Sequence, residues 1–521
     1  MSKVYSSDIG LQQKILDGVN KLADNVAVTL GPKGRNVILS KKGANPIITK
    51  DGVTVANFIE FDDVFENAAA NILKQVASET NTSAGDGTTT STVLARDIIR
   101  NSQKYLIAGS SPVELKRGMD KAKEEIIAKI KELSRPVDSI DDIENIAIIS
   151  SNNDRKIGKL IASAVDKVGH EGSILIEEGR SLETSLDLVE GFRLSSGYFS
   201  QSFVTNERKN SIEHEDALIL VTDYKLDSVK KILPALELAA RESKPLIIVA
   251  EQVEGQALAA LIMNSVRGSM KVVAVKGPEY GIERTKIMED LSIATGATFF
   301  TRSSGKSLDT IVLSDFGLCS RIEVLKNSTT IMGGTGDHEQ IEQRIDALKS
   351  EIKQTEDFSE CEKIQRRITR LASGVAVIRV GGATEVEMIE KKHRIEDALE
   401  AVRSAQEEGI VPGGGTTLLR CREFVIESDN EDQEFGANIV RKSLEAPIRQ
   451  MASNCGESQD LIVAAIESEK NNFGYDFKLG KIVDMLKNGI IDPTKVTRTA
   501  LENSVSAAST LITTSNAIVE E

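Results

Sequence analysis

Two stretches of helical periodicity, one at each end of the chain, enclose a middle segment of a different kind. From Asp8 to Val28 apolar residues recur every three or four positions, which is the period of a helix with one buried face. The same period returns in three further segments, 63–80, 88–108 and 112–133. Across residues 217–275, short apolar runs alternate with helical patterns, which indicates βαβ units and a mainly parallel sheet.

Glycine and proline residues indicate where one part of the chain is expected to end and the next to begin. The residue before Pro136 is pushed out of helical geometry, so we expect the first helical block to end there. Further joints are expected near Gly191 and Gly374. Short strands are predicted over 36–39 and 46–49, the second running into a tight turn at Lys50-Asp51-Gly52.

The part of the chain after the middle segment is expected to be mostly helical. Residues 338–372 predict one long charged helix or a helix pair, and residues 374–381 predict a strand. Thr384 and Glu387 have the spacing of a capping box that opens a helix to about residue 408. From residue 409 we expect helices to the end.

Composition excludes several classes of function. Asp and Glu outnumber Lys and Arg by 79 to 64, so we expect no nucleic acid partner. The four cysteines and four histidines show no zinc-ligand spacing. No window approaches ~18 uninterrupted apolar residues, and the opening MSKVYSSDIG has no signal or transit pattern. We therefore expect a cytoplasmic protein with no membrane partner, and 521 residues leave room for roughly two to four domains.

The strongest local motif is Gly85-Asp-Gly-Thr-Thr-Thr90, which precedes a helical pattern. Its glycines let the backbone approach a ligand, its threonines cap a helix whose N–H groups favour an anion, and Asp86 has the oxygen chemistry that suits Mg²⁺. An ordinary capped helix after a turn explains the same residues. Neither a P-loop pattern nor a G-x-G-x-x-G pattern occurs, so any nucleotide site must be of another design.

Five other features are ambiguous when each is taken alone. Thr29-Leu-Gly-Pro32 either presents backbone groups to a phosphate or stops a helix. Asp51 either orients a water from an exposed turn or belongs to a common turn dipeptide. Gly413–Gly415 either approaches a flat ligand or forms a flexible joint. Asp492 fits a helix N-cap followed by proline, and Asp397 is by default a solvated helix charge.

Apolar residues on two predicted helices of the middle segment allow two interpretations. They are Leu233, Leu236, Leu258, Ile262 and Met263. Periodicity favours a buried core, and an exposed apolar groove for partners is the alternative.

Ten segments, taken together, resemble the group I chaperonins of the GroEL type. They are TLGPKGRNV, ITKDGVTVA, AGDGTTTSTVLA, LKRGMDKA, GVAVIRVGGATEVEM, RIEDAL, EEGIVPGGG, EAPIRQ, NCGE and IIDPTKVTR. The resemblance runs from about residue 3 to residue 515, in the family's order and spacing. It implies an ATP-driven folding machine whose subunits form a ring around a cavity for non-native polypeptides.

The resemblance also implies a multidomain fold of α and α/β parts. A mainly helical equatorial domain would comprise residues 1–134 and 409–521. A small α/β intermediate domain would comprise residues 135–190 and 374–408, and residues 191–373 would form the α/β apical domain that binds substrate.

By the same resemblance, specific residues are expected to bind ATP with Mg²⁺ and K⁺. The nucleotide-binding residues would be Thr29, Leu30, Gly31, Pro32, Lys50, Asp86, Gly87, Thr88, Thr89, Thr90, Gly414 and Asp492. Asp86 would hold Mg²⁺, and the K⁺ ligands would be Thr29, Lys50 and Thr89. Asp397 matches the family's catalytic aspartate, which swings in after ATP binding to help activate the attacking water, and Asp51 matches a second carboxylate that contributes to hydrolysis.

The expected partners are unfolded or misfolded polypeptides, a small GroES-type co-chaperonin lid, and copies of the same chain in a seven-membered ring, single or double. The apical groove for polypeptides would be formed by Tyr198, Phe203, Leu233, Leu236, Leu258, Ile262, Met263 and Asn264. A ring-forming holdase or scaffold with weakened or lost ATPase activity is the alternative function.

Several residues depart from the family's usual pattern. Asp476, Phe477 and Lys478 stand where that family usually has an asparagine followed by two small residues that touch adenine, so we expect Phe477 and Lys478 to alter that end of the pocket. Gln201 and Ser202 replace a usual proline and aromatic residue beside the groove. We therefore expect a divergent member of the family, encoded by a phage or another unusual genome.

Overall fold

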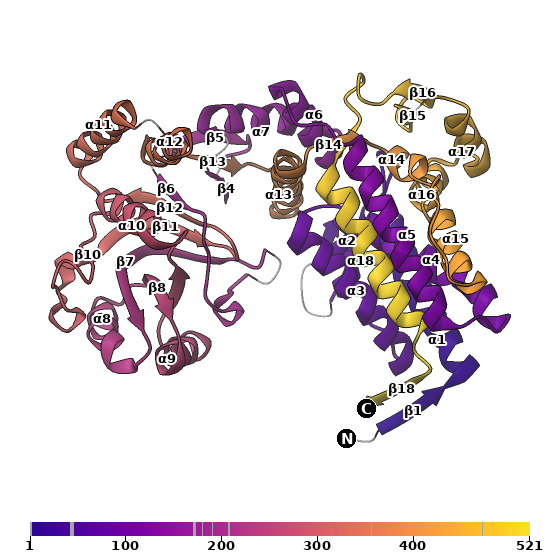
Figure 1. Cartoon of the computed structure of the whole chain (residues 1–521), viewed down its shortest axis with the longest axis horizontal. Coiled ribbons are helices and arrows are strands. Elements are labelled where there is room, and N and C mark those ends of the chain that lie inside the picture. The colour runs from indigo at the N-terminus through magenta and orange to yellow at the C-terminus, as the bar shows by residue number, and fades with distance from the viewer. Residues whose placement is uncertain are drawn as a thin grey trace. The chain divides into compact units, whose positions relative to one another are not determined.

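The described residues of the computed structural model form two compact units (Figure 1). They are residues 3–41, 46–169, 173–179, 181–189, 191–206, 209–355, 357–372, 374–470 and 472–520. Unit 1 comprises Met1–Ser163, Arg180–Glu183 and Val380–Glu521, and unit 2 comprises Ala164–Gly179 and Thr184–Arg379. The predicted boundary residues 190 and 373 lie outside the described residues, and the three-domain division stays a prediction.

Unit 1 is mainly helical, as the sequence predicts. Its helices are α1 (Asp8–Ala27), α2 (Gly52–Phe58), α3 (Val64–Ala84), α4 (Thr88–Ile107), α5 (Pro112–Leu133), α6 (Ile140–Ser150), α13 (Glu385–Glu408), α14 (Thr416–Arg420), α15 (Glu431–Ser443), α16 (Ala446–Cys455), α17 (Gln459–Glu467) and α18 (Thr494–Ile512). Helix α7 (Arg155–Val168) passes from unit 1 into unit 2. Thr384 caps α13 as predicted, accepting a hydrogen bond from the N–H of Glu387, whose carboxylate accepts from the N–H of Ala383.

The prediction of helices alone from residue 409 to the end is wrong. Strands β14 (Ile410–Pro412) and β17 (Ile491–Pro493) pair, as do β15 (Phe473–Asp476) and β16 (Lys481–Asp484). β18 (Asn516–Glu520) pairs with β1 (Lys3–Ser7), and the predicted strands β2 (Val37–Leu39) and β3 (Ile47–Thr49) pair with each other. These strands are too short to show a two-residue apolar alternation, so the sequence pattern did not reveal those after residue 409.

The core of unit 1 joins the two ends of the chain. In α1, the predicted apolar face is buried, with Val19, Leu22 and Val26 fully inside. Leu501 and Val505 of α18 belong to the same hydrophobic cluster. Figure 1 shows α18, in yellow, beside the purple helices α3, α4 and α5, with which it packs. The antiparallel pairing of β1 with β18 then brings the two chain ends together.

Unit 2 has α/β architecture. Its strands are β4 (Ser173–Glu178), β5 (Ser185–Val189), β6 (Gly191–Leu194), β7 (Ile212–Leu226), β8 (Leu246–Val253), β9 (Val272–Lys276), β10 (Phe299–Phe300), β11 (Gly317–Val324), β12 (Thr329–Gly334) and β13 (Val375–Val380). Its helices are α8 (Val229–Glu242), α9 (Gly255–Val266), α10 (Gly281–Thr295), α11 (His338–Gln354) and α12 (Phe358–Ala372), so residues 338–372 form the predicted pair. Short 3₁₀ turns occur at Gln201–Phe203, Leu308–Thr310 and Leu313–Asp315.

The seven-stranded sheet of unit 2 is mixed. The strands predicted within residues 217–275 pair in parallel, as predicted, and the strands outside that segment make the sheet mixed. Strands follow the order β6-β12-β11-β7-β8-β9, and β10 also pairs with β7. β7, β8, β9 and β10 pair in parallel, whereas β6, β12 and β11 are joined by antiparallel pairing. Helices α8 and α9 provide the predicted crossovers between parallel strands. β11 and β12 need only a tight connection, which left no helical pattern to read.

A buried ion pair fastens α11 and α12 to the body of unit 2. Arg367 of α12 donates hydrogen bonds of 2.7 and 2.9 Å to the carboxylate of Asp290 in α10, and both side chains are 2% exposed. Arg344 of α11 donates to the same carboxylate at 2.8 Å. One carboxylate therefore accepts hydrogen bonds from two guanidinium groups that reach it from different helices, and Arg344 also pairs with Glu289.

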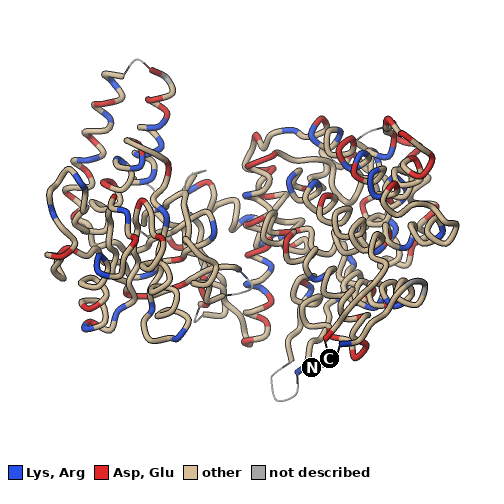
Figure 2. Tube along the Cα trace, turned by 60° about the horizontal axis from the view of Figure 1, so that its bottom comes forward, with Lys and Arg blue, Asp and Glu red and all other residues tan. Residues whose placement is uncertain are grey.

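Charged residues of both signs are interspersed along the described trace (Figure 2). Among the described helices, none combines the length and the apolar character that a membrane crossing requires.

Replacing Asp290 with alanine is expected to lower the free energy of unfolding of unit 2 by about 3–5 kcal/mol, because Arg367 would stay buried without a counter-charge. Urea unfolding of the whole chain measures the effect. Asp346→Ala is the matched control, since Asp346 pairs with Lys349 at the surface and is 76% exposed. Equal shifts in the two variants would contradict the role of the buried pair.

Candidate functional site

A cavity of about 530 Å³ lies within unit 1. It is lined by every residue predicted for the nucleotide and for hydrolysis, namely Thr29, Leu30, Gly31, Pro32, Lys50, Asp51, Asp86, Gly87, Thr88, Thr89, Thr90, Asp397, Gly414, Asp476, Phe477, Lys478 and Asp492. These residues come from seven separate stretches of sequence. The fold brings together what the sequence keeps far apart.

The N-terminus of α4 opens into this cavity. Its N-cap is Gly87, with φ at 83° and no side chain to cap the helix, so the prediction that threonines cap it is wrong. Thr88, Thr89 and Thr90 form the first helical turn instead. The first N–H groups of a helix have no partner within the helix, so this turn can bind an anion such as a phosphate.

Asp51 caps a short helix that the sequence analysis missed. Its carboxylate accepts hydrogen bonds from the N–H groups of Val53 and Thr54 at the start of α2, so the predicted tight turn is a helix start. At Gly52, a Cβ atom would lie 2.4 Å from Oγ1 of Thr89. The absence of a side chain at Gly52 therefore lets Asp51 approach the first turn of α4.

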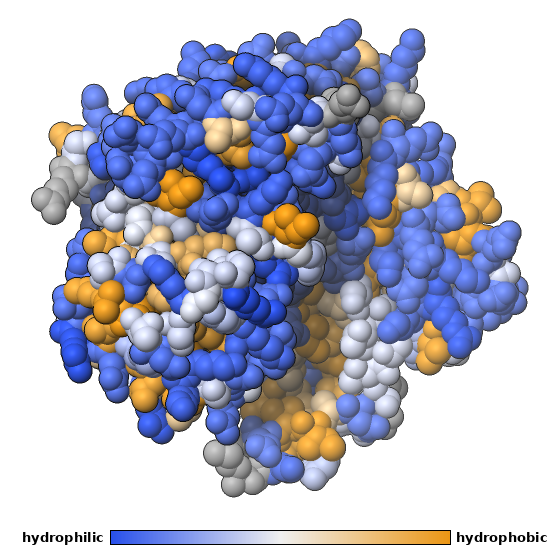
Figure 3. Space-filling model, turned by 60° about the vertical axis from the view of Figure 1, so that its left-hand side comes forward, coloured by the Kyte–Doolittle hydropathy of each residue, from blue (hydrophilic) through white to orange (hydrophobic). Residues whose placement is uncertain are grey.

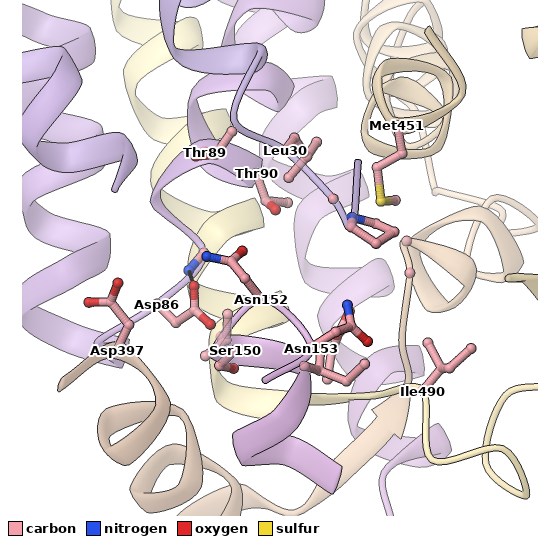
Figure 4. Close-up of a pocket in the computed structure, with 18 of the residues that line it drawn as sticks. Leu30, Asp86, Thr89, Thr90, Ser150, Asn152, Asn153, Asp397, Met451 and Ile490 are labelled. Atoms are coloured by element: carbon pink, nitrogen blue, oxygen red, sulfur yellow. Dashed lines mark hydrogen bonds between the residues drawn. The ribbon is translucent and has the colours of Figure 1, made fainter. Parts of the chain in front are cut away.

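Asp86 is surrounded by groups with opposing effects. Burial raises the pKa of this carboxyl, hydrogen bonds from the N–H of Gly87 and the hydroxyl of Ser150 lower it, and the nearby Asp51 raises it. Figure 4 shows Asp86 and Asp397 on the same side of the cavity, with Ser150 close to Asp86. A bound cation would relieve the electrostatic cost of placing these carboxylates together.

Asp492 lies in β17 rather than at the N-cap of α18, which is Pro493, so the predicted capping role is wrong. Burial raises the pKa of Asp492 to about 7, with a further increase from Asp86 and an opposing effect from the N–H of Gly414. Gly414 follows β14, the partner strand of β17. The strand pair thus places Asp492 and the glycine turn at one end of the cavity.

Lys50 links two walls of the cavity. Its ammonium group donates to the carbonyl of Gly31 at 3.1 Å and to Oδ1 of Asn152 at 3.0 Å. Burial lowers the pKa of Lys50, and so does Arg394 nearby. This lysine is placed to hold negative charge in the cavity.

The turn between α6 and α7 also lines the cavity, and the sequence analysis did not identify it. Asn152 and Asn153 both have positive φ, at 60° and 63°. Asparagine tolerates this backbone region better than most residues, so the Asn-Asn pair was the only local signal. Arg394 of α13 holds the same turn through a 3.2 Å ion pair with Asp154.

The far end of the cavity is apolar. Phe477 is 4% exposed and packs in a cluster with Met451 and with the partly buried Leu30 and Tyr475. The rings of Tyr475 and Phe477 meet edge to face at 5.0 Å. Asp476 accepts hydrogen bonds from the N–H groups of Lys478 and Leu479 and so stabilises its own turn. Figure 4 places Leu30, Met451 and Ile490 at this end, where a flat base would find apolar contacts.

The cavity walls fit oxygen-ligated cations. Asp86 supplies a carboxylate, and the hydroxyl oxygens of Thr29 and Thr89 lie 3.1 Å apart. Within the described part of the chain, no group of three His, Cys, Asp or Glu side chains is placed to hold a metal ion by itself. A Mg²⁺ ion at Asp86 would therefore take its other oxygens from phosphates and water, as this ion usually does.

The predicted polypeptide groove in unit 2 is only partly at the surface. Leu233 and Met263, on α8 and α9, are 45% and 47% exposed, and Leu258 and Ile262 are partly buried beside them. Tyr198, Phe203 and Leu236 are buried in the core, which corrects their expected place on the groove surface. They fill the space beneath the helices.

Other residues complete or stiffen this apolar face. Val229 and Val266 are exposed on the same two helices and were missed, although helical spacing from Leu233 and Met263 indicates both. Asn264 bonds locally, donating to the carbonyl of Ala260 and accepting from Ser269. Figure 3 shows hydrophobic side chains among mainly hydrophilic ones on the side of the molecule where unit 2 is drawn.

Comparison with known proteins agrees with the fold and the cavity. The chain matches the model of the TCP-1/cpn60 chaperonin family over residues 22–521, and it belongs to this family. It is also similar to the chaperonin gp146 from bacteriophage EL of Pseudomonas aeruginosa, crystallised in the presence of ATP-BeFx in two crystal forms. Both matches have 22% identity and cover 99% of each chain, with TM-scores of 0.70 and 0.62. The predicted chaperonin fold is therefore confirmed.

The raised pKa of Asp492 predicts how the stability of the chain depends on pH. Between about pH 4 and pH 7 the folded chain keeps a proton on Asp492, whereas the unfolded chain has released it. The free energy of unfolding of the unsubstituted chain therefore falls as pH rises through this range. Asp492→Asn should therefore gain stability over the unsubstituted chain as pH rises to 7, and the difference should be constant above it.

Urea unfolding without nucleotide or divalent cations, from pH 4 to pH 8, measures this difference. Asp346→Asn at the exposed surface pair controls for the loss of one negative charge. A stability difference for Asp492→Asn that does not change with pH would contradict the assignment.

Proposed function

We propose that this chain is an ATP-driven chaperone that assembles into a ring, binds non-native polypeptides and promotes their folding by binding and hydrolysing ATP. One observation carries the proposal. Asp397, from α13, lines the same cavity as the open N-terminus of α4 and the carboxylate of Asp86. The similarity to a phage chaperonin crystallised with ATP-BeFx supports a nucleotide as the ligand.

Phosphate binding would use backbone N–H groups and one ammonium group. The first-turn N–H groups of Thr88 to Thr90 and the ammonium of Lys50 face the cavity and bind phosphate oxygens. The apolar end formed by Leu30 and Met451 receives the base, and Asp492 meets the ribose hydroxyls. Phosphoryl transfer depends mainly on such positioning and charge neutralisation.

Hydrolysis also requires an oriented water. Asp397 accepts a hydrogen bond from this water and takes its proton, and Asp51 adds a second carboxylate at the first turn of α4. Asp86 would hold Mg²⁺, which would supply positive charge beside the phosphates. The backbone oxygens of Thr29 and Lys50, with Thr89, would hold K⁺. A carboxylate on a helix that can move couples hydrolysis to a change of shape.

Client binding would use the exposed faces of α8 and α9. Leu233, Met263, Val229 and Val266 form an aliphatic surface, which binds unfolded chains by apolar burial without a sequence requirement. The same surface is the candidate site for a small GroES-type lid. Seven copies in a single or double ring would set these surfaces around one cavity.

Asp397→Ala is expected to bind ATP normally and to lose at least about 100-fold in steady-state turnover, since a positioned base contributes 10²–10⁴. Turnover and ATP affinity are measured on the assembled protein. Glu385→Ala is the matched control, because Glu385 is an exposed acid on the same helix. Unchanged turnover in Asp397→Ala would sink the catalytic assignment, and a ring without wild-type turnover would favour the holdase.

Replacing Leu233 and Met263 together with serine is expected to weaken capture of a denatured protein at least tenfold, since burying each side chain contributes roughly 1.5–3 kcal/mol. Suppression of aggregation measures capture, and ATP turnover should stay unchanged. Val312→Ser is the control, because Val312 is 53% exposed in unit 2 outside α8 and α9. Equal loss of capture in the control would reject the groove.

A further inference from the structure

The face of α13 that carries Asp397 also contacts the C-terminal end of α3. Asp397, Glu400 and Ser404 are spaced by three and four residues, so they share one face of the helix. The hydroxyl of Ser404 donates a 2.8 Å hydrogen bond to the carbonyl oxygen of Ala84, the last residue of α3. Asp86 follows two residues later, so this bond joins α13 to the phosphate-facing loop.

Gly85 lets α13 approach this closely. It is the C-cap of α3, with φ at 72°, a backbone region that favours glycine. A Cβ atom at Gly85 would lie 2.1 Å from Cβ of Glu400. The backbone of the loop before Asp86 is therefore in direct contact with α13, one turn from Asp397.

The C-terminal end of α13 is held by other contacts. The carbonyl of Glu408 accepts a 2.8 Å hydrogen bond from the hydroxyl of Ser134, and its carboxylate pairs with Arg498. Arg135 and Ile410 then bond through both backbone groups. Asp397 lies about 16 Å along the helix from Glu408, at 1.5 Å per residue. The contact at Ser404 lies between this held end and Asp397, so it helps to fix where Asp397 lies, together with the ion pair of Arg394 with Asp154.

We propose that Ser404 is a positioning residue that keeps α13 seated on the end of α3, the arrangement in which Asp397 lines the cavity beside Asp86. This inference rests on the proposed ATPase function. Ser404 is 3% exposed and Ala84 is 2% exposed, so the hydroxyl, not water, satisfies this carbonyl while α13 is seated. If α13 moves away, water can solvate the carbonyl. The hydrogen bond therefore stabilises the seated arrangement over others.

Ser404 does not line the cavity, which separates its role from nucleotide binding. Its loss should reduce the fraction of molecules with Asp397 in place, and so reduce kcat, without weakening ATP affinity. Alanine is the best helix former, so Ser404→Ala leaves α13 itself intact. We expect a three- to tenfold decrease in kcat, with the dissociation constant for ATP within twofold of the unsubstituted chain.

Ser504→Ala is the matched control. Ser504 is fully buried in unit 1, but its hydroxyl donates to the carbonyl of Leu501 within α18. It therefore loses a buried hydroxyl without loosening α13, and we expect no change in kcat. Thermal unfolding of both variants compares their general loss of stability. An equal decrease in kcat in the two variants would overturn the proposal.

The double variant shows whether Ser404 acts through Asp397. In an Asp397→Ala background, Ser404→Ala should cause no further decrease in single-turnover hydrolysis. A full, independent decrease there would overturn the positioning role.

Hydrogen exchange tests the seating without relying on turnover. Peptides covering residues 84–90 and 397–408 should exchange faster in Ser404→Ala than in Ser504→Ala, in the absence of nucleotide. If the unsubstituted chain does not hydrolyse ATP, the proposed function fails. The hydrogen-exchange comparison then tests by itself whether Ser404 holds α13 against α3. Unchanged exchange, or faster exchange with unchanged turnover, would overturn the proposal.

Discussion

The packing of α18 against α3, α4 and α5 is the constraint on which the rest of unit 1 depends. It buries apolar side chains from the last long helix in a core made by the first ones. Because β17 leads directly into α18, this packing also brings Asp492 to the loop that carries Asp86. The hydrophobic effect sets the core, and the cavity forms where the connecting loops meet above it.

The cavity concentrates groups that are costly to bury without a ligand. Burial raises the pKa of both Asp86 and Asp492, and the nearby carboxylate of Asp86 raises the pKa of Asp492 further. The open N-terminus of α4 and the ammonium of Lys50 supply positive charge within the same space. A polyanion with its cations would satisfy both sets at once and would offset the cost of burying these polar groups.

α13 carries Asp397 and contacts other parts of unit 1 on both sides of it. It reaches the loop before Asp86 through Ser404 and the α6–α7 turn through Arg394. Its far end is held by Glu408. These contacts hold α13 in the arrangement in which Asp397 lines the cavity.

The sequence by itself determined the first helices, the α/β middle and the boundaries of the predicted helices within a few residues, because period and turn chemistry are local. Its resemblance to the chaperonins pointed to the residues of the site. It could not show that Phe477 is buried or that Asp492 belongs to a strand, since both depend on partners distant in sequence. The Asn152-Asn153 pair was a weak signal for its turn and did not show that the turn lines the cavity. A buried position for Tyr198, Phe203 and Leu236 looks the same in sequence as an exposed apolar stripe. Only the tertiary structure decided these points, because burial and hydrogen bonding are properties of packed elements and not of one segment.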